Sequence, residues 1–453
     1  MNLPSTPCGR RKRLRKTSLV LLLAPALALF ATGQVHADAV TDWNQTINQA
    51  ANVIGSSPHQ SYVAAMSHVA IHDALNSIDR RYATYAVVPA ANANASPNAA
   101  IAAAARRVLI QQLNRPPETD AKANARAMVQ SRYQEALDAI PDGTAKQQGI
   151  AAGVAAADAI IAMRSNDGSG TPNRPYTLAP APGVYQPTPP GFVPPTYAGW
   201  AVLPPFTLTS PSQFRSPPGA LFNLTGGAYT TDYAEVKAVG DARVRGAAPD
   251  SERSDIARFW PGGGGDWNAT ARVIVANRDL DRWQHARLFA LLNLATADAA
   301  ISEFDTKYAY NFWRPVTAIR WADDGNPATQ PDHEWLSFIN TPSYPDYVCG
   351  LTMTSGAATS VLRRYFVKDG ISFSRTVQVP GVSLPSPMAP LPAKTITRSY
   401  TSLSQAAAES VNARVYGGMH FREGCEQGVV QGENVGRHVL QNYLQPLRSR
   451  LDY

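Results

Sequence analysis

The chain has 453 residues, 44% of them hydrophobic and 17% charged, which is an ordinary globular composition with ample length for a large core. Its formal net charge is +7, but residues 1–37 hold six Lys or Arg and no acid, which leaves +1 for the remainder. A chain so close to neutral excludes broad electrostatic binding to nucleic acid, and no nucleic-acid partner is expected.

The first 37 residues have the pattern of a secretory signal peptide. A basic cluster at 10–16 precedes the apolar run Ser18–Ala31 and a small-x-small cleavage site that ends at Ala37. The run is shorter than the roughly 20 residues that a membrane-spanning helix needs, and no second run of that length follows. We therefore expect cleavage after Ala37, a periplasmic or secreted protein, and no membrane span in the mature chain. Adjacent Arg10 and Arg11 leave Sec and twin-arginine export both open.

The rest of the chain predicts an all-α protein, because apolar residues recur at helical spacing and long β-branched alternation is absent. Proline and glycine stops separate the segments. The expected helices cover 40–54, 59–78, 97–114, 119–139, 144–164, 229–245, 251–261, 279–309, 352–367, 402–414 and 424–444. The domain organisation we expect is a signal peptide (1–37), an N-terminal helical part (38–164), a Pro/Gly-rich strap (165–228) and a helical core (229–453).

The strap has too much Gly, Pro and Ser to be helical. Aromatic residues are nevertheless interspersed along it, which is unusual for a solvated linker. These aromatics are Tyr185, Phe192, Tyr197, Trp200 and Phe206. We expect them to pack the strap onto the surface of the helices. The Pro-rich stretch 370–398 has no clear pattern and predicts no regular element.

Three segments of the helical core carry candidate chemistry. Lys307 and Arg314 are seven residues apart, so they share one face if their helix continues to Pro315, and two cations on one face suit an anion. Gly350 precedes an expected helix whose free N–H groups would also suit an anion. Arg414 and His420 flank a glycine pair that lets backbone approach a ligand. Taken singly, each segment can equally be solvated surface or a simple turn.

In order and spacing, these segments resemble the signature of the vanadium-dependent haloperoxidase / type 2 phosphatidic acid phosphatase superfamily: Lys-x6-Arg-Pro, Pro-Ser-Gly-His and Ser-Arg-x5-His. Ser67–Asp79, Arg287–Phe312 and Gly428–Leu447 also look like its bacterial secreted haloperoxidase-like branch. The resemblance implies all-α helical bundles of the haloperoxidase / acid phosphatase type. It further implies a pocket for vanadate, or for phosphate in the same place.

Carried over residue by residue, the resemblance makes Lys307, Arg314 and Arg414 the cations that neutralise the oxyanion, and Gly350 the glycine whose N–H faces it. His420 would be the catalytic histidine. In a haloperoxidase it would coordinate vanadium, with peroxide and halide as substrates. In an acid phosphatase it would attack a phosphate ester and form a phosphohistidine.

This sequence also departs from the signature. The motif serine is Cys349, and the motif histidine, the usual acid–base group, is Leu351. General acid–base catalysis contributes about 10²–10⁴-fold, so a third alternative is a degenerate oxyanion-binding protein without turnover. Thr352, Tyr347 and His333 are candidate substitutes for the missing group.

Two cysteines remain after signal cleavage, Cys349 and Cys425. An even count in an oxidising compartment favours a disulfide, and two buried free thiols are the alternative. The resemblance places both cysteines beside the oxyanion pocket, where a bridge would join two of its walls.

Overall fold

The computed structural model describes residues 38–170, 175–260 and 264–447. Residues from Ala37 onward form one unit of the fold. The predicted signal peptide, residues 1–37, lies outside the described residues.

The N-terminal part is a bundle of five helices, each within three residues of its predicted bounds. They are α1 (Ala39–Ile54), α2 (Ser57–Ile78), α3 (Pro97–Leu113), α4 (Asp120–Asp138) and α5 (Thr144–Met163). The side chains of Asp38, Ser96 and Thr119 cap three of these helices by accepting a hydrogen bond from a backbone N–H of the first turn. Helix α2 packs against α1, α3 and α5, so local capping and burial of apolar faces both favour this bundle.

The second half of the chain is also mainly helical. Its helices are α6 (Gly227–Val239), α7 (Ala242–Ala247), α8 (Glu252–Phe259), α9 (Gly264–Val275), α10 (Arg282–Tyr310), α11 (Pro315–Arg320), α12 (Gly350–Tyr365), α13 (Leu403–Tyr416) and α14 (Arg422–Asn442). The single helix expected over 229–245 is divided at Gly240, where a side chain would lie only 2.5 Å from Cα of Gly418. The sequence analysis missed α9 and α11.

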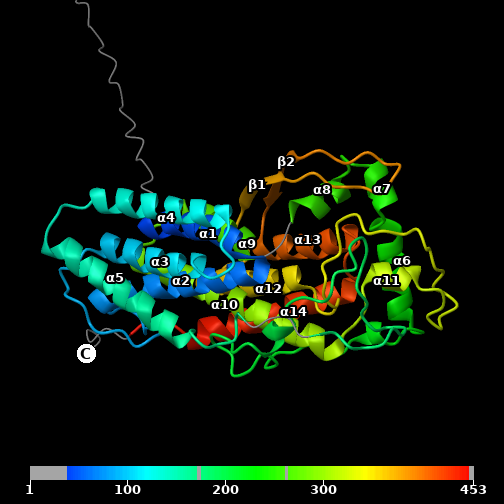
Figure 1. The fold of residues 1–453 in the computed structure, drawn as a ribbon, viewed down its shortest axis with the longest axis horizontal. Coiled ribbons are helices and arrows are strands. Elements are labelled where there is room, and N and C mark those ends of the chain that lie inside the picture. Colours follow the sequence, from blue (N-terminus) through cyan, green and yellow to red (C-terminus); the bar gives the residue numbers. More distant parts are fainter. Residues whose placement is uncertain (1–37, 171–174, 261–263, 448–453) are drawn as a thin grey trace, which may run out of the picture. The chain divides into compact units, whose positions relative to one another are not determined.

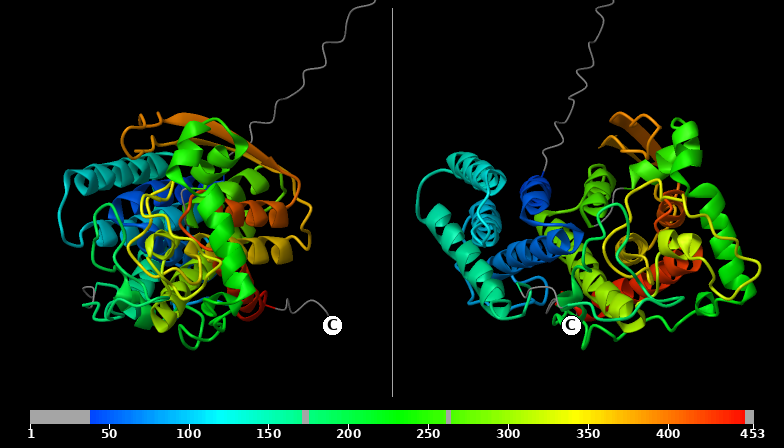
Figure 2. Two further views of the ribbon diagram at one scale, coloured as in Figure 1. Left: turned by 90° about the vertical axis from the view of Figure 1, so that its right-hand side faces the viewer. Right: turned by 45° about the vertical axis from the view of Figure 1, so that its right-hand side comes forward.

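Helix α10 connects the two halves of the fold. It packs against α2 of the N-terminal bundle and against α12 and α14 of the second half, and it lies in the middle of these helices (Figures 1 and 2). Most of its residues are buried, which explains why its sequence has no separate polar and apolar faces. The C-terminal end of this buried helix carries Lys307.

Helices α12 and α14 pack unusually closely, and glycines of α14 make this possible. Gly428, Gly432 and Gly436 follow one face of α14 at four-residue spacing. A Cβ at Gly432 would lie 2.0 Å from the carbonyl oxygen of Met353, and one at Gly436 would lie 2.4 Å from that of Ala357. The close contact holds the N-terminal ends of α12 and α14 side by side.

The strap is irregular, as predicted, apart from the short 3₁₀ turns η1 (Ala198–Val202) and η2 (Ala220–Phe222). Tyr185, Trp200 and Phe206 are buried, whereas Phe192 is 63% exposed, so the predicted packing fails at that one aromatic. The carboxylate of Asp298 in α10 accepts hydrogen bonds from the backbone N–H groups of Phe206 (2.6 Å) and Thr207 (2.7 Å). These bonds anchor the strap to the central helix.

A β-hairpin occupies the stretch that predicted no regular element. Strands β1 (Phe373–Val379) and β2 (Lys394–Tyr400) pair antiparallel, with Phe373 opposite Tyr400. Burial of alternate residues stabilises it against α8 and α9. The fold class is nevertheless all-α, as predicted, because this two-stranded sheet is the only sheet among the described residues. Among those residues, no helix is long and apolar enough to cross a membrane.

Candidate functional site

Lys307 lies in the last turn of α10 and is fully buried. Its Nζ donates hydrogen bonds to the carbonyl oxygens of Pro345 (3.1 Å), Asp346 (2.9 Å) and Val348. Burial lowers the pKa of Lys307 to about 8, although the neighbouring carboxylate of Glu303 acts in the opposite direction. The ammonium group thus fixes the segment that leads into α12.

Arg314 is not on the same helix as Lys307, which corrects the sequence-based expectation. Helix α10 ends at Tyr310 because Asn311 adopts a left-handed conformation (φ 51°), and Arg314 then caps the N-terminus of α11. Arg314 still meets the segment that Lys307 binds, since its Nε donates to the carbonyl oxygen of Tyr344 at 2.8 Å. The two cations therefore converge on one segment although the helix ends between them.

His420 lies in the turn between α13 and α14, buried beside Arg314 and Asp346. Its Nδ1 is 2.9 Å from Oδ1 of Asp346, and its Nε2 is 2.9 Å from Nη1 of Arg314. Arg314 can only donate, so Nε2 is the acceptor and the proton is assigned to Nδ1. The carboxylate of Asp346 therefore orients the imidazole with its lone pair toward the cations. The sequence analysis did not single out Asp346.

Gly350 begins α12 and Cys349 caps it without a side-chain hydrogen bond. The backbone N–H of Cys349 donates to the carbonyl oxygen of Gly424 at 3.0 Å, which joins the starts of α12 and α14. Leu351 is buried in the first turn of α12. The N-terminal end of α12 thus lies within the buried cluster, where its free N–H groups would suit an anion.

Glu303 is the other residue that the sequence analysis missed. It precedes Lys307 by one helical turn and lies 3.7 Å from it, a spacing that in sequence resembles an ordinary surface ion pair. Its carboxylate is packed against Gly350, where an added Cβ would lie 2.1 Å from Oε1. Burial raises the pKa of Glu303 to about 7, against the opposing charges of Lys307, Arg314 and Arg414.

Arg414 lies in the last turn of α13 and is buried. Its charge acts on the pKa values of Glu303 and Cys349, which places it with the same groups. Nε of Arg414 and Nη2 of Arg314 are buried donors with no hydrogen-bond partner among the described residues. Unpaired buried guanidinium donors are costly unless an acceptor binds there.

The three candidate substitutes for the motif histidine do not supply an acid–base group. The hydroxyl of Thr352 donates to the carbonyl oxygen of Cys349 (3.0 Å), and that of Tyr347 donates to the carbonyl oxygen of Pro217 (2.7 Å). His333 is exposed and bonds to the carbonyl oxygen of Arg320 (3.0 Å), away from the buried cluster. Glu303 is the titratable group that faces Gly350 instead.

Cys349 and Cys425 are neighbours, but the predicted disulfide is absent because both are free, buried thiols. Burial alone would raise the pKa of both thiols. The hydrogen bond between the two sulfurs shifts their pKa values in opposite directions, lowering that of Cys349 and raising that of Cys425. The bond from Cys425, the interaction with His420 and the charge of Arg414 hold the pKa of Cys349 well below its usual range, whereas the pKa of Cys425 is raised and its thiol stays protonated. A hydrogen-bonded thiol pair thus replaces the expected covalent bridge.

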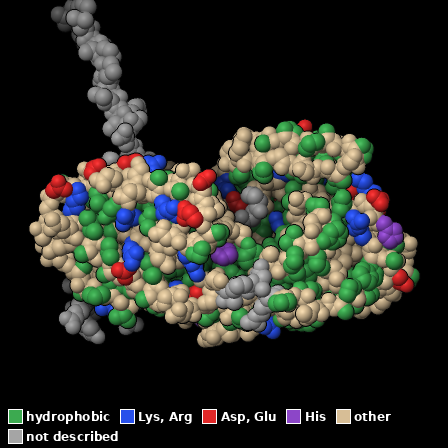
Figure 3. Space-filling model, in the orientation of Figure 1, with side chains coloured by type: hydrophobic (Ala, Val, Ile, Leu, Met, Phe, Trp, Pro, Cys, Tyr) green, Lys and Arg blue, Asp and Glu red, His purple; other side chains and the backbone are tan. Residues whose placement is uncertain are grey.

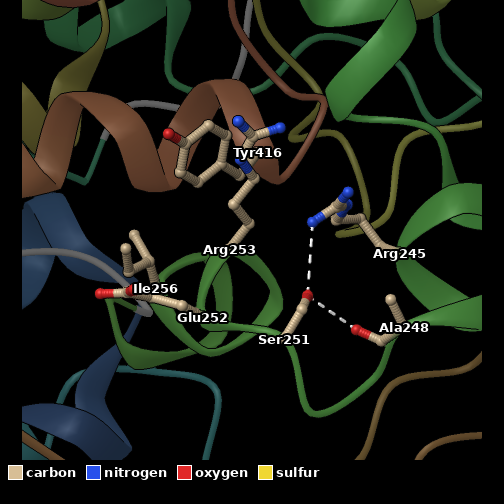
Figure 4. Close-up of a pocket in the computed structure, with 7 residues that line it drawn as sticks. All are labelled: Arg245, Ala248, Ser251, Glu252, Arg253, Ile256 and Tyr416. Atoms are coloured by element: carbon tan, nitrogen blue, oxygen red, sulfur yellow. Dashed lines mark hydrogen bonds between the residues drawn. The ribbon is translucent and has the colours of Figure 1, made fainter.

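A separate surface pocket of about 490 Å³ is lined by Arg245, Ser251, Glu252, Arg253 and Tyr416, among others (Figure 4). None of the predicted site residues lines it. On the molecular face in Figure 3, basic and acidic side chains are interspersed rather than gathered in one patch. The predicted site residues thus lie in the buried cluster and not at this surface pocket.

Comparisons with known proteins place the chain beside vanadium-dependent peroxidases. A family model described as the VCPO second helical-bundle domain matches residues 287–449, which include every predicted site residue. Vanadium chloroperoxidase of Curvularia inaequalis is 26% identical over 401 residues, covering 72% of this chain. The chain spans 65% of the length of that relative.

Solved structures extend the comparison to nearly the whole fold. The first bacterial vanadium-dependent iodoperoxidase superposes with a TM-score of 0.72 at 25% identity, covering 90% of this chain and 98% of that one. A holo-type bacterial vanadium-dependent chloroperoxidase shares the fold, with a TM-score of 0.64 at 18% identity over 85% and 91% of the two chains. The family model, the curated relative and the solved structures thus all support the vanadium haloperoxidase superfamily.

Proposed function

We propose that Lys307, Arg314, Arg414, Gly350 and His420 hold an oxyanion, vanadate or phosphate in its place, and that the protein is a haloperoxidase-like enzyme that oxidises halide with peroxide. The observation that carries the proposal is the unpaired state of two buried guanidinium donors, Nη2 of Arg314 and Nε of Arg414. Relatives named as chloroperoxidase and iodoperoxidase support halide as the substrate class.

The residues present fit vanadate. An oxyanion supplies the acceptor oxygens that the two unpaired donors lack. Asp346 holds the proton of His420 on Nδ1, so Nε2 is the nitrogen that would coordinate vanadium. Arg314 now donates to that lone pair and would turn its N–H groups to the oxyanion instead.

Bound vanadate would supply Lewis-acid activation of peroxide toward two-electron oxidation of halide. The side chains of the protein must neutralise the anion's charge and supply and accept protons during turnover. Lys307 fixes the backbone of 345–348, and the arginines balance the anion's charge. Leu351 cannot carry a proton. We therefore assign the acid–base function to Glu303, whose carboxyl group has a pKa of about 7 and packs against Gly350.

Glu303 also sets a condition for anion binding. When ionised, its carboxylate places a negative charge against Gly350, where the oxyanion would approach. When protonated, it removes that charge and can donate a hydrogen bond to the anion. The protonated form of Glu303 is therefore the competent form, which makes the pocket more receptive below pH 7 than above it.

Phosphoryl transfer is the second candidate, favoured by one observation. A histidine whose Nδ1–H is held by a buried carboxylate, with its Nε2 lone pair among cations, is also suited to attack phosphorus. The same pocket would then stabilise the transferred phosphoryl group.

The test uses purified protein dialysed with orthovanadate. Iodide and bromide oxidation by peroxide would be measured beside hydrolysis of p-nitrophenyl phosphate. The proposal expects vanadate-dependent halide oxidation that phosphate suppresses, and loss of this activity in Arg414→Ala. Arg215→Ala is the matched control, because Arg215 pairs with Asp305 outside the cluster.

The outcomes separate the alternatives. Ester hydrolysis inhibited by vanadate, without halide oxidation, would replace the proposal by the phosphatase. Saturable vanadate binding with neither activity would identify a degenerate oxyanion-binding protein. Absence of vanadate and phosphate binding would reject the oxyanion pocket itself.

A further inference from the structure

We propose that Cys349, Cys425 and His420 form a binding site for a thiophilic metal ion of the Zn²⁺ or Cu⁺ class. One ligand atom from each of the three residues lies within 4.8 Å of the other two, and all three residues are buried. Two sulfurs and one imidazole are a typical donor set for these ions. The inference does not rest on oxyanion binding or on halide oxidation.

Two packed helices hold the three donors in place. Cys349 caps α12, Cys425 lies in the first turn of α14, and His420 lies two residues before α14 begins. The backbone N–H of Cys349 donates to the carbonyl oxygen of Gly424, so one hydrogen bond ties the two cysteine-bearing segments together. Gly428 allows this close approach, because a Cβ added at this position would lie only 2.7 Å from the carbonyl oxygen of Cys349. The site is therefore formed by the fold before any ion arrives.

The surroundings suit a metal-bound histidine. Asp346 lies 2.9 Å from Nδ1 of His420, the carboxylate–histidine arrangement that orients ligating imidazoles. Oδ2 of Asp346 is buried and has no hydrogen-bond partner within the described part of the chain. Zn²⁺ with two thiolates is electrically neutral, and Cu⁺ with two thiolates carries one negative charge. Neither adds positive charge to a cluster that already contains Lys307, Arg314 and Arg414.

Binding replaces the thiol–thiol hydrogen bond by two metal–sulfur bonds. Any proton still on Cys349 or Cys425 passes to solvent, and no oxidation or reduction is involved. His420 is also the proposed vanadium ligand, so a bound ion and vanadium on His420 exclude each other. Metal loading is thus expected to weaken vanadate binding.

The experiment uses the full protein, reduced and folded, with vanadate absent. Metal content would be measured by mass spectrometry after loading with Zn²⁺ or Cu⁺ and exhaustive dialysis. Co²⁺ would serve as a spectroscopic probe, because thiolate ligation gives a charge-transfer absorption. We expect one equivalent of metal and the thiolate–cobalt band, both lost in Cys349→Ser and in Cys425→Ser. The better retained of Zn²⁺ and Cu⁺ identifies the ion.

Controls separate site binding from misfolding and from loose binding. His333→Ala removes an exposed histidine and is expected to retain the metal, whereas Asp346→Asn is expected to weaken binding about 10–100-fold. Circular dichroism must show both serine variants folded, with Cys425→Ala as a replacement if one is not. Less than about a tenth of an equivalent in the folded protein, or full retention in the cysteine variants, would overturn the inference. Vanadate binding is measured separately, by titration of the metal-free protein. The metal site and the oxyanion pocket can therefore be rejected independently of each other.

Discussion

Oδ1 of Asp346 lies 2.9 Å from Nδ1 of His420, and both side chains are buried beside Arg314. This contact fixes which nitrogen of His420 is available to a ligand. It connects the segment before α12 to the turn before α14, so the geometry of the proposed site depends on a pair that is 74 residues apart in the chain.

Asp346→Asn is expected to weaken vanadate binding about 10–100-fold, because an amide cannot hold the Nδ1 proton of His420 as the carboxylate does. Equilibrium dialysis at fixed pH measures the change. Asp305→Asn is the control, since Asp305 is also largely buried and paired with an arginine, Arg215, but outside the cluster. Equal loss in both variants would mean that Asp346 acts only through stability.

Glu303→Gln is expected to change the pH dependence of oxyanion binding. The pKa of Glu303 is about 7, so above this pH the wild-type affinity should fall about tenfold per unit as the competent protonated fraction falls. The glutamine of the variant cannot ionise, so its affinity should not show this fall above pH 7. Phosphate or vanadate titrations at pH 6, 7, 8 and 9 measure it, and the anion's own titration cancels between the two proteins. Parallel pH profiles would contradict the model of a competing carboxylate.

The stability of the protein should also depend on Glu303. Burial raises its pKa from 4.5 to about 7, so the folded state holds the proton more tightly than the unfolded state. Its stabilising contribution is complete below pH 4.5 and is lost as the pH rises through 7, by up to about 3 kcal/mol. Urea unfolding of wild type and Glu303→Gln between pH 4.5 and 8 measures the difference. A difference that grows in the opposite direction would show that the charged form is the one the fold prefers.

Leu351→His restores the histidine that the motif would have, on the first turn of α12. If proton transfer limits turnover, halide oxidation should rise about 10²–10⁴-fold. Leu351→Asn has similar polarity without a group that titrates near neutrality, and it should give no rise. No gain in Leu351→His, with folding intact, would mean that the missing motif histidine does not limit turnover, as expected if Glu303 supplies the proton.

Gly432→Ala tests the close packing that positions both cysteines. The added Cβ would lie 2.0 Å from the carbonyl oxygen of Met353, so α12 and α14 must separate, at a cost of about 1–3 kcal/mol. Urea unfolding measures it. Gly227→Ala is the control, because nothing lies within 4 Å of its Cβ position. A Gly432→Ala protein as stable as the control would show that the helices are not held at this distance.

The helices themselves were largely predictable from the sequence. Capping residues such as Ser96 and Thr119 and apolar spacing act within a few positions, so their effects can be recognised locally. The all-α class followed from the same patterns. The hairpin was missed because β1 and β2 stabilise each other across a Pro-rich loop, and neither strand has a strong pattern alone.

The order and spacing of Lys307, Arg314, Arg414 and His420 resemble the signature of the superfamily, and that resemblance was sufficient to suggest one pocket. How the residues meet was decided by tertiary structure. Helix α10 ends just before Asn311, between the two cations, and glycine packing of α14 on α12 sets the cysteines beside His420 without a covalent bond. Burial then gives Glu303 and Asp346 their roles, since a carboxylate's charge acts strongly only where the fold has removed water from it.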